Sequence, residues 1–231
     1  MGLSLRLTEV KNMVSPCETA CDIGCDHGFV SIELMRSGRA KRVIACDINE
    51  GPLEACKKNV ALAGLSEKID IRLADGLSGI KKSDRADAII IAGMGGNLMT
   101  EILSKGTEIV RASRELILQP QSEIFLVRRF LRENGFEINK ESFVLDAGKY
   151  YFIIDAVHAK EGEKAETKDK EFYDNYPEYL IREGNPLYKQ YLQEQLKLTE
   201  GYLSGVKDEL SRETLNKRYK DLMKALSMME D

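Results

Sequence analysis

Short apolar runs alternate with amphipathic helical patterns over the first two thirds of the chain. The runs with strand character are 18–24, 42–48, 69–75, 86–93 and 115–120. Helical spacing fills the intervals at 29–38, 51–64, 96–105 and 123–134, and one more short helix is expected at the N-terminus. Strands that alternate with helices predict an α/β fold with a doubly wound, parallel sheet.

The pattern changes after residue 135. The runs 136–146 and 149–159 both have strand character, and only Ala147 and Gly148 separate them. Two residues leave no room for a helix, so the runs form a hairpin in which one strand is antiparallel to the sheet. Parallel strands followed by such a hairpin are typical of the Rossmann-like sheet of class I S-adenosylmethionine-dependent methyltransferases. A dehydrogenase-type dinucleotide fold more often ends in parallel strands.

A second domain is expected after residue 159. The segment 160–171 is charged and poor in apolar residues, which is typical of a linker. Beyond it, Asn185 is the expected cap of a long helix and Pro186 its first residue. The predicted division is therefore a catalytic domain at 1–159 and a helical domain at 160–231.

Apolar residues in the helical domain recur at heptad spacing. The first series of apolar residues ends at Leu210. The next apolar position, Leu215, follows after five residues instead of three or four, so the heptad phase is skipped and a second series begins. The skipped phase predicts a coiled-coil-like hairpin that turns between Gly201 and Thr214, with one long helix containing a stutter as the alternative. The seam is composed of Leu192, Leu196, Thr199, Leu203, Val206 and Leu210, then Leu215, Tyr219, Leu222, Leu226 and Met229.

Composition describes a globular protein that we expect in the cytoplasm. Hydrophobic residues make up 43% of the chain, but no apolar run approaches the roughly 20 residues of a membrane helix. The N-terminus lacks the apolar core of a signal peptide. The net charge of −4 neither favours nucleic-acid binding nor excludes it, because a local basic face can contact phosphates. Two basic clusters are available, although each taken alone is better explained as a solvated helix face: Arg36, Arg39, Lys41 and Arg42, and Arg128, Arg129 and Arg132.

All five cysteines lie in the first quarter of the chain, at positions 17, 21, 25, 46 and 56. The two-residue spacing of zinc knuckles is absent, and an odd number argues against a disulfide framework. We therefore predict buried free thiols and no metal site.

The stretch CDIGCDHGFV at 21–30 follows the first strand and contains D-x-G-x-x-x-G. Gly24 permits a tight turn, and Gly28 permits close packing of the next helix. Asp26 stands where a dinucleotide loop has a glycine, and its charge opposes a pyrophosphate. The same charge suits the sulfonium and amino groups of S-adenosylmethionine, which is therefore the expected cofactor.

Two further acids follow the next two strands. Asp47 ends the second strand, 25 residues after Asp22, where a carboxylate accepts both hydroxyls of an adenosine ribose. Asp75 and Gly76 end the third strand, where an acid accepts the exocyclic amine of the adenine. Each acid alone is explained as a strand-terminating cap, but three at consecutive strand ends predict a site for one adenosine ligand.

Five segments make a resemblance specific: DIGCDHGFVSIEL, NEGPLEACKKNV, RLADGL, IIIAGMGGNLM and LILQPQSEIFLVRRFL. They resemble the bacterial tRNA (adenine(22)-N(1))-methyltransferases over most of residues 3–157, and the heptad tail fits that family's helical domain in character. Members usually carry a small residue in place of Cys25 and often a glutamate in place of Asp47. The resemblance implies donor binding by Asp22, Gly24, Cys25, Asp26, His27, Gly28, Asp47, Ile48, Asp75, Gly76, Gly93, Met94 and Gly95.

The fourth strand ends in Gly93-Met94-Gly95-Gly96, without the acid or amide with which enzymes orient an exocyclic adenine nitrogen. The ring nitrogen N1 has a free lone pair, so its methylation needs no general base. Positioning and an acceptor for the N6 amine are then the main requirements. The candidate acceptors are the backbone carbonyls of Gly93 and Met94, Gln119 and Asp26. The expected catalytic residues are Asp26, His27, Met94 and Gln119. The expected substrate-binding residues are Arg6, Gly96, Asn97, Gln119, Pro120 and Tyr150.

An adenine in folded tRNA must leave its stack to reach this cleft, and Phe29, Tyr150 and Tyr151 are aromatic residues that either stack on it or belong to the core. We expect tRNA as partner, no membrane or metal, and a monomer, with oligomerisation through the tail left open. The fold alone does not fix the acceptor. The alternatives are a methyltransferase for a small molecule or protein, and a non-catalytic nucleotide-binding scaffold.

Overall fold

The computed structural model describes residues 3–159 and 169–230, which belong to two compact units, Met1–Ala165 and Glu166–Asp231. The expected linker lies mostly at 160–168, outside the described residues, so the boundary after residue 159 stays a prediction. Lys170 and Glu171, which were assigned to the linker, instead begin a helix.

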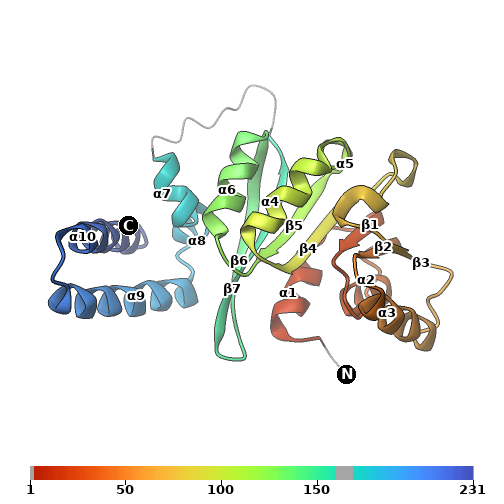
Figure 1. The fold of residues 1–231 in the computed structure, drawn as a ribbon, viewed down its shortest axis with the longest axis horizontal. Coiled ribbons are helices and arrows are strands. Elements are labelled where there is room, and N and C mark those ends of the chain that lie inside the picture. The colour runs from red at the N-terminus through yellow and green to blue at the C-terminus, as the bar shows by residue number, and fades with distance from the viewer. Residues whose placement is uncertain (1–2, 160–168, 231) are drawn as a thin grey trace. The chain divides into compact units, whose positions relative to one another are not determined.

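A seven-stranded sheet forms the centre of the first unit, with strand order β3-β2-β1-β4-β5-β7-β6 (Figure 1). Strand β7 is antiparallel to both neighbours, and the pairs among the first five strands are parallel. The predicted parallel sheet with a terminal hairpin is therefore confirmed. The strands are β1 (Cys17–Ile23), β2 (Ala40–Asp47), β3 (Ile69–Leu73), β4 (Ala88–Met94), β5 (Glu115–Pro120), β6 (Phe136–Asp146) and β7 (Lys149–His158).

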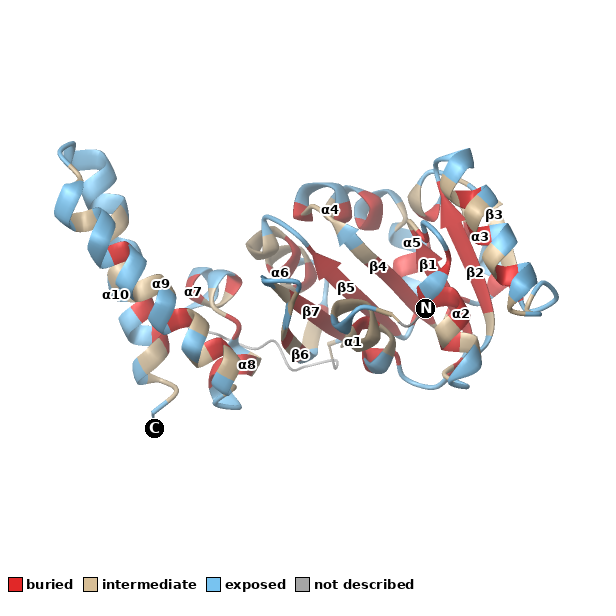
Figure 2. Cartoon of the chain, turned by 90° about the horizontal axis from the view of Figure 1, so that it is seen from below, coloured by how far each residue is buried: buried red, intermediate tan, exposed pale blue. Residues whose placement is uncertain are grey.

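Helices cover both faces of this sheet, so its central strands are buried (Figure 2). Ile89 and Ile91 of β4 face one hydrophobic cluster and Ile90 faces the other, as strand alternation requires. Helices α1 (Leu5–Met13), α2 (Phe29–Arg36) and α3 (Glu50–Leu62) cover one face. Helices α4 (Gly96–Lys105), α5 (Thr107–Ala112) and α6 (Ile124–Glu133) cover the other; α5 was not predicted.

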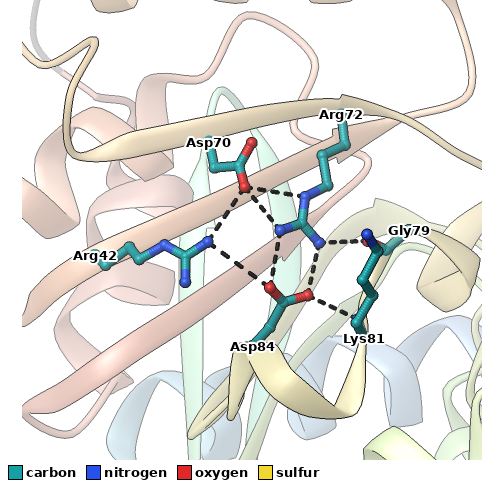
Figure 3. Close-up of polar contacts among 6 residues, drawn as sticks. All are labelled: Arg42, Asp70, Arg72, Gly79, Lys81 and Asp84. Atoms are coloured by element: carbon teal, nitrogen blue, oxygen red, sulfur yellow. Dashed lines mark hydrogen bonds and ion pairs between the residues drawn. The ribbon is translucent and has the colours of Figure 1, made fainter.

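An ion-pair network fastens the outer edge of the sheet (Figure 3). Arg72 of β3 reaches Asp84 at 2.6 Å and Asp70 at 2.7 Å. Asp84 ends the short 3-10 helix η2 (Lys82–Asp84), and its carboxylate also accepts the backbone N–H of Lys81 at 2.7 Å. Arg42 of β2 joins both aspartates at 3.2 and 3.7 Å. The network ties β2, β3 and the β3–β4 connection together.

The second unit consists of four helices in its described residues: α7 (Lys170–Asn175), α8 (Glu178–Arg182), α9 (Pro186–Gly205) and α10 (Glu209–Ser227). Asn185 caps α9 as predicted, because its side chain accepts the Tyr188 N–H at 3.0 Å. Helices α9 and α10 pack against each other, and the chain reverses at 206–208. The predicted hairpin is confirmed and the single long helix is not.

The heptad seam is only partly buried. Leu192, Thr199 and Leu222 are buried, whereas Leu210 is 76% exposed. The assignment of Val206 and Leu210 to the first series is wrong. Helix α9 ends at Gly205, so Val206 lies in the turn, and Leu210 belongs to the first turn of α10. Coiled-coil packing of the remaining positions stays a prediction.

All five cysteines are buried and free, as predicted. Within residues 3–159 and 169–230, no cluster of three or more metal-ligating side chains occurs. None of the helices in that part of the chain is long and apolar enough to cross a membrane.

Candidate donor and substrate site

The strand order reverses between β1 and β4, and the loop after β1 therefore lies where α/β sheets bind ligands. Gly24 and Gly28 have φ values of +74° and +72°, and Asp26 has +49°. A Cβ on Gly24 would lie 2.1 Å from the terminal methyl carbon of Met94, and one on Gly28 would lie 2.5 Å from Cys56 Sγ. Both glycines are thus favoured by backbone conformation, and Gly28 also by its close contact with Cys56.

Asp47 joins this loop to the end of β2. Its carboxylate accepts the backbone N–H of Asp26 at 3.1 Å and that of Asn49 at 3.0 Å. The side chain is buried at the base of the loop, with 8% of its surface exposed. Its two oxygens are therefore held in a fixed position beside Asp26.

Asp22 is the most buried of the strand-end acids. Its Oδ2 accepts the hydroxyl of Ser31 at 2.6 Å, and both residues are buried. Burial raises the pKa of Asp22 to about 6, opposed by the hydrogen bonds from Ser31, with further raising by Asp47 and Asp26. The sequence did not single out Ser31; its place in the first turn of α2, after Gly28, was the available signal.

The third acid, Asp75, follows β3 and is exposed at the start of the 3-10 helix η1 (Gly76–Gly79). The Ala74 N–H donates to the Asp47 carbonyl at 2.9 Å, which fixes this end of β3 against β2. Ile48, the residue after Asp47, is 60% exposed. Because β3, β2 and β1 are neighbours, the three acids and this apolar side chain share one edge of the sheet.

The Gly93–Gly96 turn ends β4. Gly93 has φ +83° and coincides with an irregularity in the β4–β5 pairing. The Met94 carbonyl accepts the Gln121 N–H at 2.8 Å, so the turn is bonded to the loop after β5. A Cβ on Gly96 would lie 2.4 Å from the Glu123 carbonyl oxygen, which leaves room for glycine alone. Asn97 follows and is exposed.

Gln119, at the end of β5, is fully buried. Its amide oxygen accepts the Gly93 N–H at 3.1 Å and a guanidinium N–H of Arg6, while its amide nitrogen donates to the Pro120 carbonyl at 3.0 Å. Both lone pairs of the oxygen are engaged. This arrangement favours a role in positioning the Gly93–Gly96 turn over direct contact with an adenine.

Arg6 also links α1 to the β6–β7 hairpin. Its backbone N–H donates to Asp146 Oδ2 at 3.1 Å, and its guanidinium lies 5.3 Å from the centre of the Tyr151 ring. The neighbouring Tyr150 stacks on Phe143, with ring centres 5.2 Å apart. The hairpin and α1 thus border the carboxyl ends of β4 and β5.

His27 and Phe29 lie at the exposed side of the donor loop. The imidazole Nε2 of His27 lies 3.6 Å from Asp26 Oδ1. The side chain of His27 is 49% exposed and that of Asp26 is 68% exposed. The Phe29 ring centre is 5.8 Å from that of His27, and Phe29 is 41% exposed. Asn59 of α3 donates to the His27 carbonyl at 3.0 Å, a contact the sequence did not indicate.

The two basic clusters are not both free to meet phosphates. Arg128 is buried against Glu141, with 2.9 Å between Arg128 Nε and Glu141 Oε1 and exposed fractions of 3% and 1%. Arg42 belongs to the ion-pair network of Figure 3. The assignment of Arg128 to a solvated face is therefore wrong, whereas Arg42 keeps 43% of its side chain exposed while it pairs with the two aspartates.

Comparisons with known proteins agree with this geometry. A methyltransferase-domain family model matches residues 3–154. The tRNA (adenine(22)-N(1))-methyltransferase of Bacillus subtilis (strain 168) is 28% identical over 240 aligned positions, covering 100% of this chain and 97% of that protein.

Solved structures are similar over nearly the whole chain. A candidate tRNA (m1A22) methyltransferase from Streptococcus pneumoniae, in complex with S-adenosyl-L-methionine, has a TM-score of 0.85 and 32% identity, covering 97% of this chain and 99% of that one. The B. subtilis m1A22 tRNA methyltransferase has a TM-score of 0.83 and 27% identity, with coverage of 97% and 98%. This chain therefore belongs to the methyltransferase-domain family and, within it, to the bacterial tRNA (adenine(22)-N(1))-methyltransferases.

Proposed function

We propose that the protein transfers a methyl group from S-adenosylmethionine to N1 of adenine 22 in tRNA. The observation that carries the proposal is the set of acids at three adjacent strand ends, Asp22, Asp47 and Asp75. They adjoin a loop whose two glycines have positive φ, and Gly28 packs closely against α3. A chain with this arrangement is matched from end to end by a tRNA (adenine(22)-N(1))-methyltransferase, which supports the choice of acceptor.

The residues present fit the donor. The fixed carboxylate of Asp47 suits the two ribose hydroxyls, and the exposed carboxylate of Asp75 suits the adenine amine. Ile48 offers an apolar side chain beside them for the adenine face. Asp22 and Asp26 supply negative charge for the cationic methionine part, and Cys25, His27, Gly28 and the Gly93–Gly95 backbone complete the site. When bound, the donor supplies an electrophilic methyl group.

The acceptor nitrogen needs orientation more than activation. N1 of adenine has an in-plane lone pair at neutral pH, so no side chain must remove a proton before attack. Charge that develops on the ring is best stabilised by an acceptor for the N6 amine. Of the expected acceptors, Gln119 is engaged by Arg6 and Gly93, whereas the Asp26 carboxylate is 68% exposed at the mouth of the loop. Asp26 is therefore the acceptor that we favour.

The substrate adenine must leave its stack before it reaches this site. Phe29, which is 41% exposed, and Tyr150, on the bordering hairpin, are suitable stacking partners. Met94, Gly96, Asn97 and Pro120, from the ends of β4 and β5 and the start of α4, are the other proposed substrate contacts. The helical unit is the proposed contact for tRNA phosphates. Because the proposed substrate is tRNA, we also propose a cytoplasmic location, and a monomer, with oligomerisation through the tail left open.

Nucleoside mass spectrometry tests the proposal. The purified protein is incubated with S-adenosylmethionine and a tRNA transcript, and we expect 1-methyladenosine in the digest. A transcript with guanine at position 22 is the matched control and is expected to remain unmethylated. Label transferred to a metabolite extract or to protein, with none in tRNA, would show one of the alternative methyltransferase activities. Failure to bind the donor in calorimetry would favour the scaffold interpretation.

A further inference from the structure

A cavity lies beside the residues that follow β3. Its volume is about 380 Å³, which falls in the range of roughly 300–1,000 Å³ that is usual for small-molecule sites. Residues of η1 and η2 line one side of it, and residues of α4 and α5 line the other. Asp75 and Gly76, where η1 begins, are among the lining residues. The cavity therefore starts at the carboxylate that is proposed to hold the adenine amine of the donor.

The floor of the cavity is apolar and buried. Its side chains are those of Leu77, Ile80, Ile102 and Ile109, and each has at most 9% of its surface exposed. A Cβ on Gly106, between α4 and α5, would lie 2.3 Å from Leu77 Cδ1. Helix η1 thus packs directly on the junction of the two helices. The cavity is preformed, so a ligand that enters it does not have to order the walls.

Lysines stand at the exposed rim of the cavity, and two of them are paired with glutamates. Lys82 forms an ion pair with Glu108, and Lys105 forms one with Glu101 at 2.7 Å. Lys81 is exposed as well, and it makes no ion pair in the part of the chain that the structure describes. Its ammonium group can therefore attract an anionic group on a ligand that extends from the floor to the rim.

We propose that this cavity is a subsite for an aromatic ring carried on the exocyclic amine of an adenosine ligand in the donor site. The inference rests on the proposed function, in which the Asp75 carboxylate accepts an N–H of that amine. The amine of adenine has two N–H groups, so a single substituent leaves the other N–H for Asp75. The substituent then continues past Asp75 into the cavity. S-adenosylmethionine ends at its amine, so the ring adds contacts that the donor itself does not make.

The chemistry of the walls sets the class of ligand. A phenyl ring that leaves water for the four apolar side chains of the floor gains affinity in proportion to the apolar area that it buries. A carboxylate at the far end of the ring meets Lys81 at the rim, where solvent screens the attraction and keeps its contribution smaller. The expected ligands are therefore N6-benzyl derivatives of adenosine compounds, and a para-carboxylate on the ring improves them further.

Calorimetry with S-adenosylhomocysteine, the product that remains after methyl transfer, tests the subsite. We expect the N6-benzyl derivative of this parent compound to bind with a Kd about tenfold lower, because its ring enters the cavity. The N6,N6-dimethyl derivative has no N–H for Asp75, and its Kd should rise at least about tenfold. A benzyl derivative that binds no more tightly than the parent compound would overturn the proposal. Equal binding of the dimethyl derivative would remove Asp75 from the site, and with it the path into the cavity.

Two serine variants show where the ring binds. Ser78 is exposed and lines the cavity, so a phenylalanine there fills the space without a change in the core. In Ser78→Phe we expect the Kd of the parent compound within about twofold of the wild-type value, and the advantage of the benzyl derivative lost. Ser83→Phe is the matched control, because Ser83 is an exposed residue of η2 that does not line the cavity, and it should keep the advantage. An advantage that persists in Ser78→Phe would place the ring elsewhere and overturn the proposal.

Lys81→Met tests the rim. The para-carboxybenzyl derivative should bind the wild type about threefold more tightly than the benzyl derivative does, and this gain should disappear in Lys81→Met. The same gain in both proteins would exclude Lys81 as the partner of the carboxylate. If the protein binds neither S-adenosylhomocysteine nor its derivatives, the proposed donor site fails and the subsite fails with it. Binding of the parent compound without a gain from the benzyl group overturns the subsite alone.

Discussion

Arg6 of the first helix donates a hydrogen bond to the buried amide oxygen of Gln119, 113 positions later in the chain. The same oxygen accepts the Gly93 N–H at 3.1 Å. One side-chain amide thus connects α1, the end of β5 and the turn after β4. This connection places the turn without touching the acids at the ends of β1, β2 and β3 that are proposed to bind the donor.

Removal of the Gln119 side chain should separate turnover from donor binding. In Gln119→Ala we expect kcat for tRNA methylation to fall about 10- to 100-fold, because a misplaced turn no longer orients the acceptor ring. The Kd for S-adenosylmethionine, measured by calorimetry, should rise less than about threefold, because the Gly93–Gly95 backbone is only one part of the proposed donor site and the strand-end acids stay in place. Arg6→Ala should behave alike, and the double variant should be little worse than either single variant, because both changes break one network. Arg111→Ala, on the exposed surface of α5, is the control. Equal loss of binding and turnover would contradict this division of roles.

Removal of the Asp47 carboxylate should instead weaken donor binding. Its carboxylate holds the Asp26 and Asn49 N–H groups and faces the proposed ribose site. In Asp47→Ala we expect the donor Kd to rise at least about 100-fold, since both the ligand contact and the loop anchor are lost. Glu54 of α3 forms an exposed ion pair with Lys57 and supplies the control. Glu54→Ala should leave the donor Kd within about twofold of the wild type. A Kd for Asp47→Ala within about fivefold of the wild type would remove Asp47 from the donor site.

The carboxyl-end acids could be predicted because the signals that place them are local. Strand alternation fixes where β1, β2 and β3 end, glycines mark the loops, and parallel strands bring their ends to one edge. The cap Asn185 was predictable for the same reason, since Ser/Asn and proline preferences act over a single helical turn.

Contacts between distant segments could not be predicted in this way. Nothing in the sequence around Gln119 indicates that the Arg6 side chain will donate a hydrogen bond to its amide oxygen. Glu141 lies in a strand with alternating polar residues and has the sequence signature of an exposed position, yet it is buried because Arg128 of α6 covers it. Burial of such a pair depends on how a helix packs on a strand. The pattern of polar and apolar residues in either segment alone does not predict this packing.

The Arg72–Asp84 pair of Figure 3 should stabilise the fold at neutral pH. The Arg72 guanidinium lowers the pKa of Asp84 to about 2 from 3.8, so the ionised form is favoured in the folded state. This contribution is present above pH 3.8 and is lost as the pH falls toward 2. We expect Asp84→Asn to lower the free energy of unfolding by about 2 kcal/mol at pH 7, measured by urea denaturation.

Asp70→Asn is the matched control in the same network. Asp70 contacts the same guanidinium, but its side chain is 41% exposed against 8% for Asp84, so water screens its charge. We expect a loss below about 1 kcal/mol for this variant. Equal losses for the two variants, or a deficit of Asp84→Asn that persists undiminished at pH 2, would argue against an ionic origin.

Donor binding should weaken in mild acid because of Asp22. Burial raises the pKa of Asp22 from 3.8 to about 6, so the folded protein holds this proton more tightly than the unfolded chain does. The contribution of Asp22 to stability is therefore greatest below pH 3.8 and is lost as the pH rises through about 6. A cationic donor selects the ionised carboxylate, so its affinity has the opposite dependence. We expect the Kd to rise about tenfold per pH unit below pH 6.

Calorimetry between pH 7.5 and pH 5 measures this rise of the donor Kd, which is the acid limb of the pH profile. Two variants identify the group that causes it. Asp22→Asn should bind weakly with a flat profile, because no proton competes with the donor. Ser31→Ala removes the hydroxyl that stabilises the carboxylate at 2.6 Å and should move the limb to higher pH with the fold retained. His27 lies in the same loop, beside Asp26, so His27→Gln is the control and should keep the wild-type limb. If His27→Gln flattens the profile and Ser31→Ala leaves it in place, Asp22 is not the group whose protonation opposes donor binding.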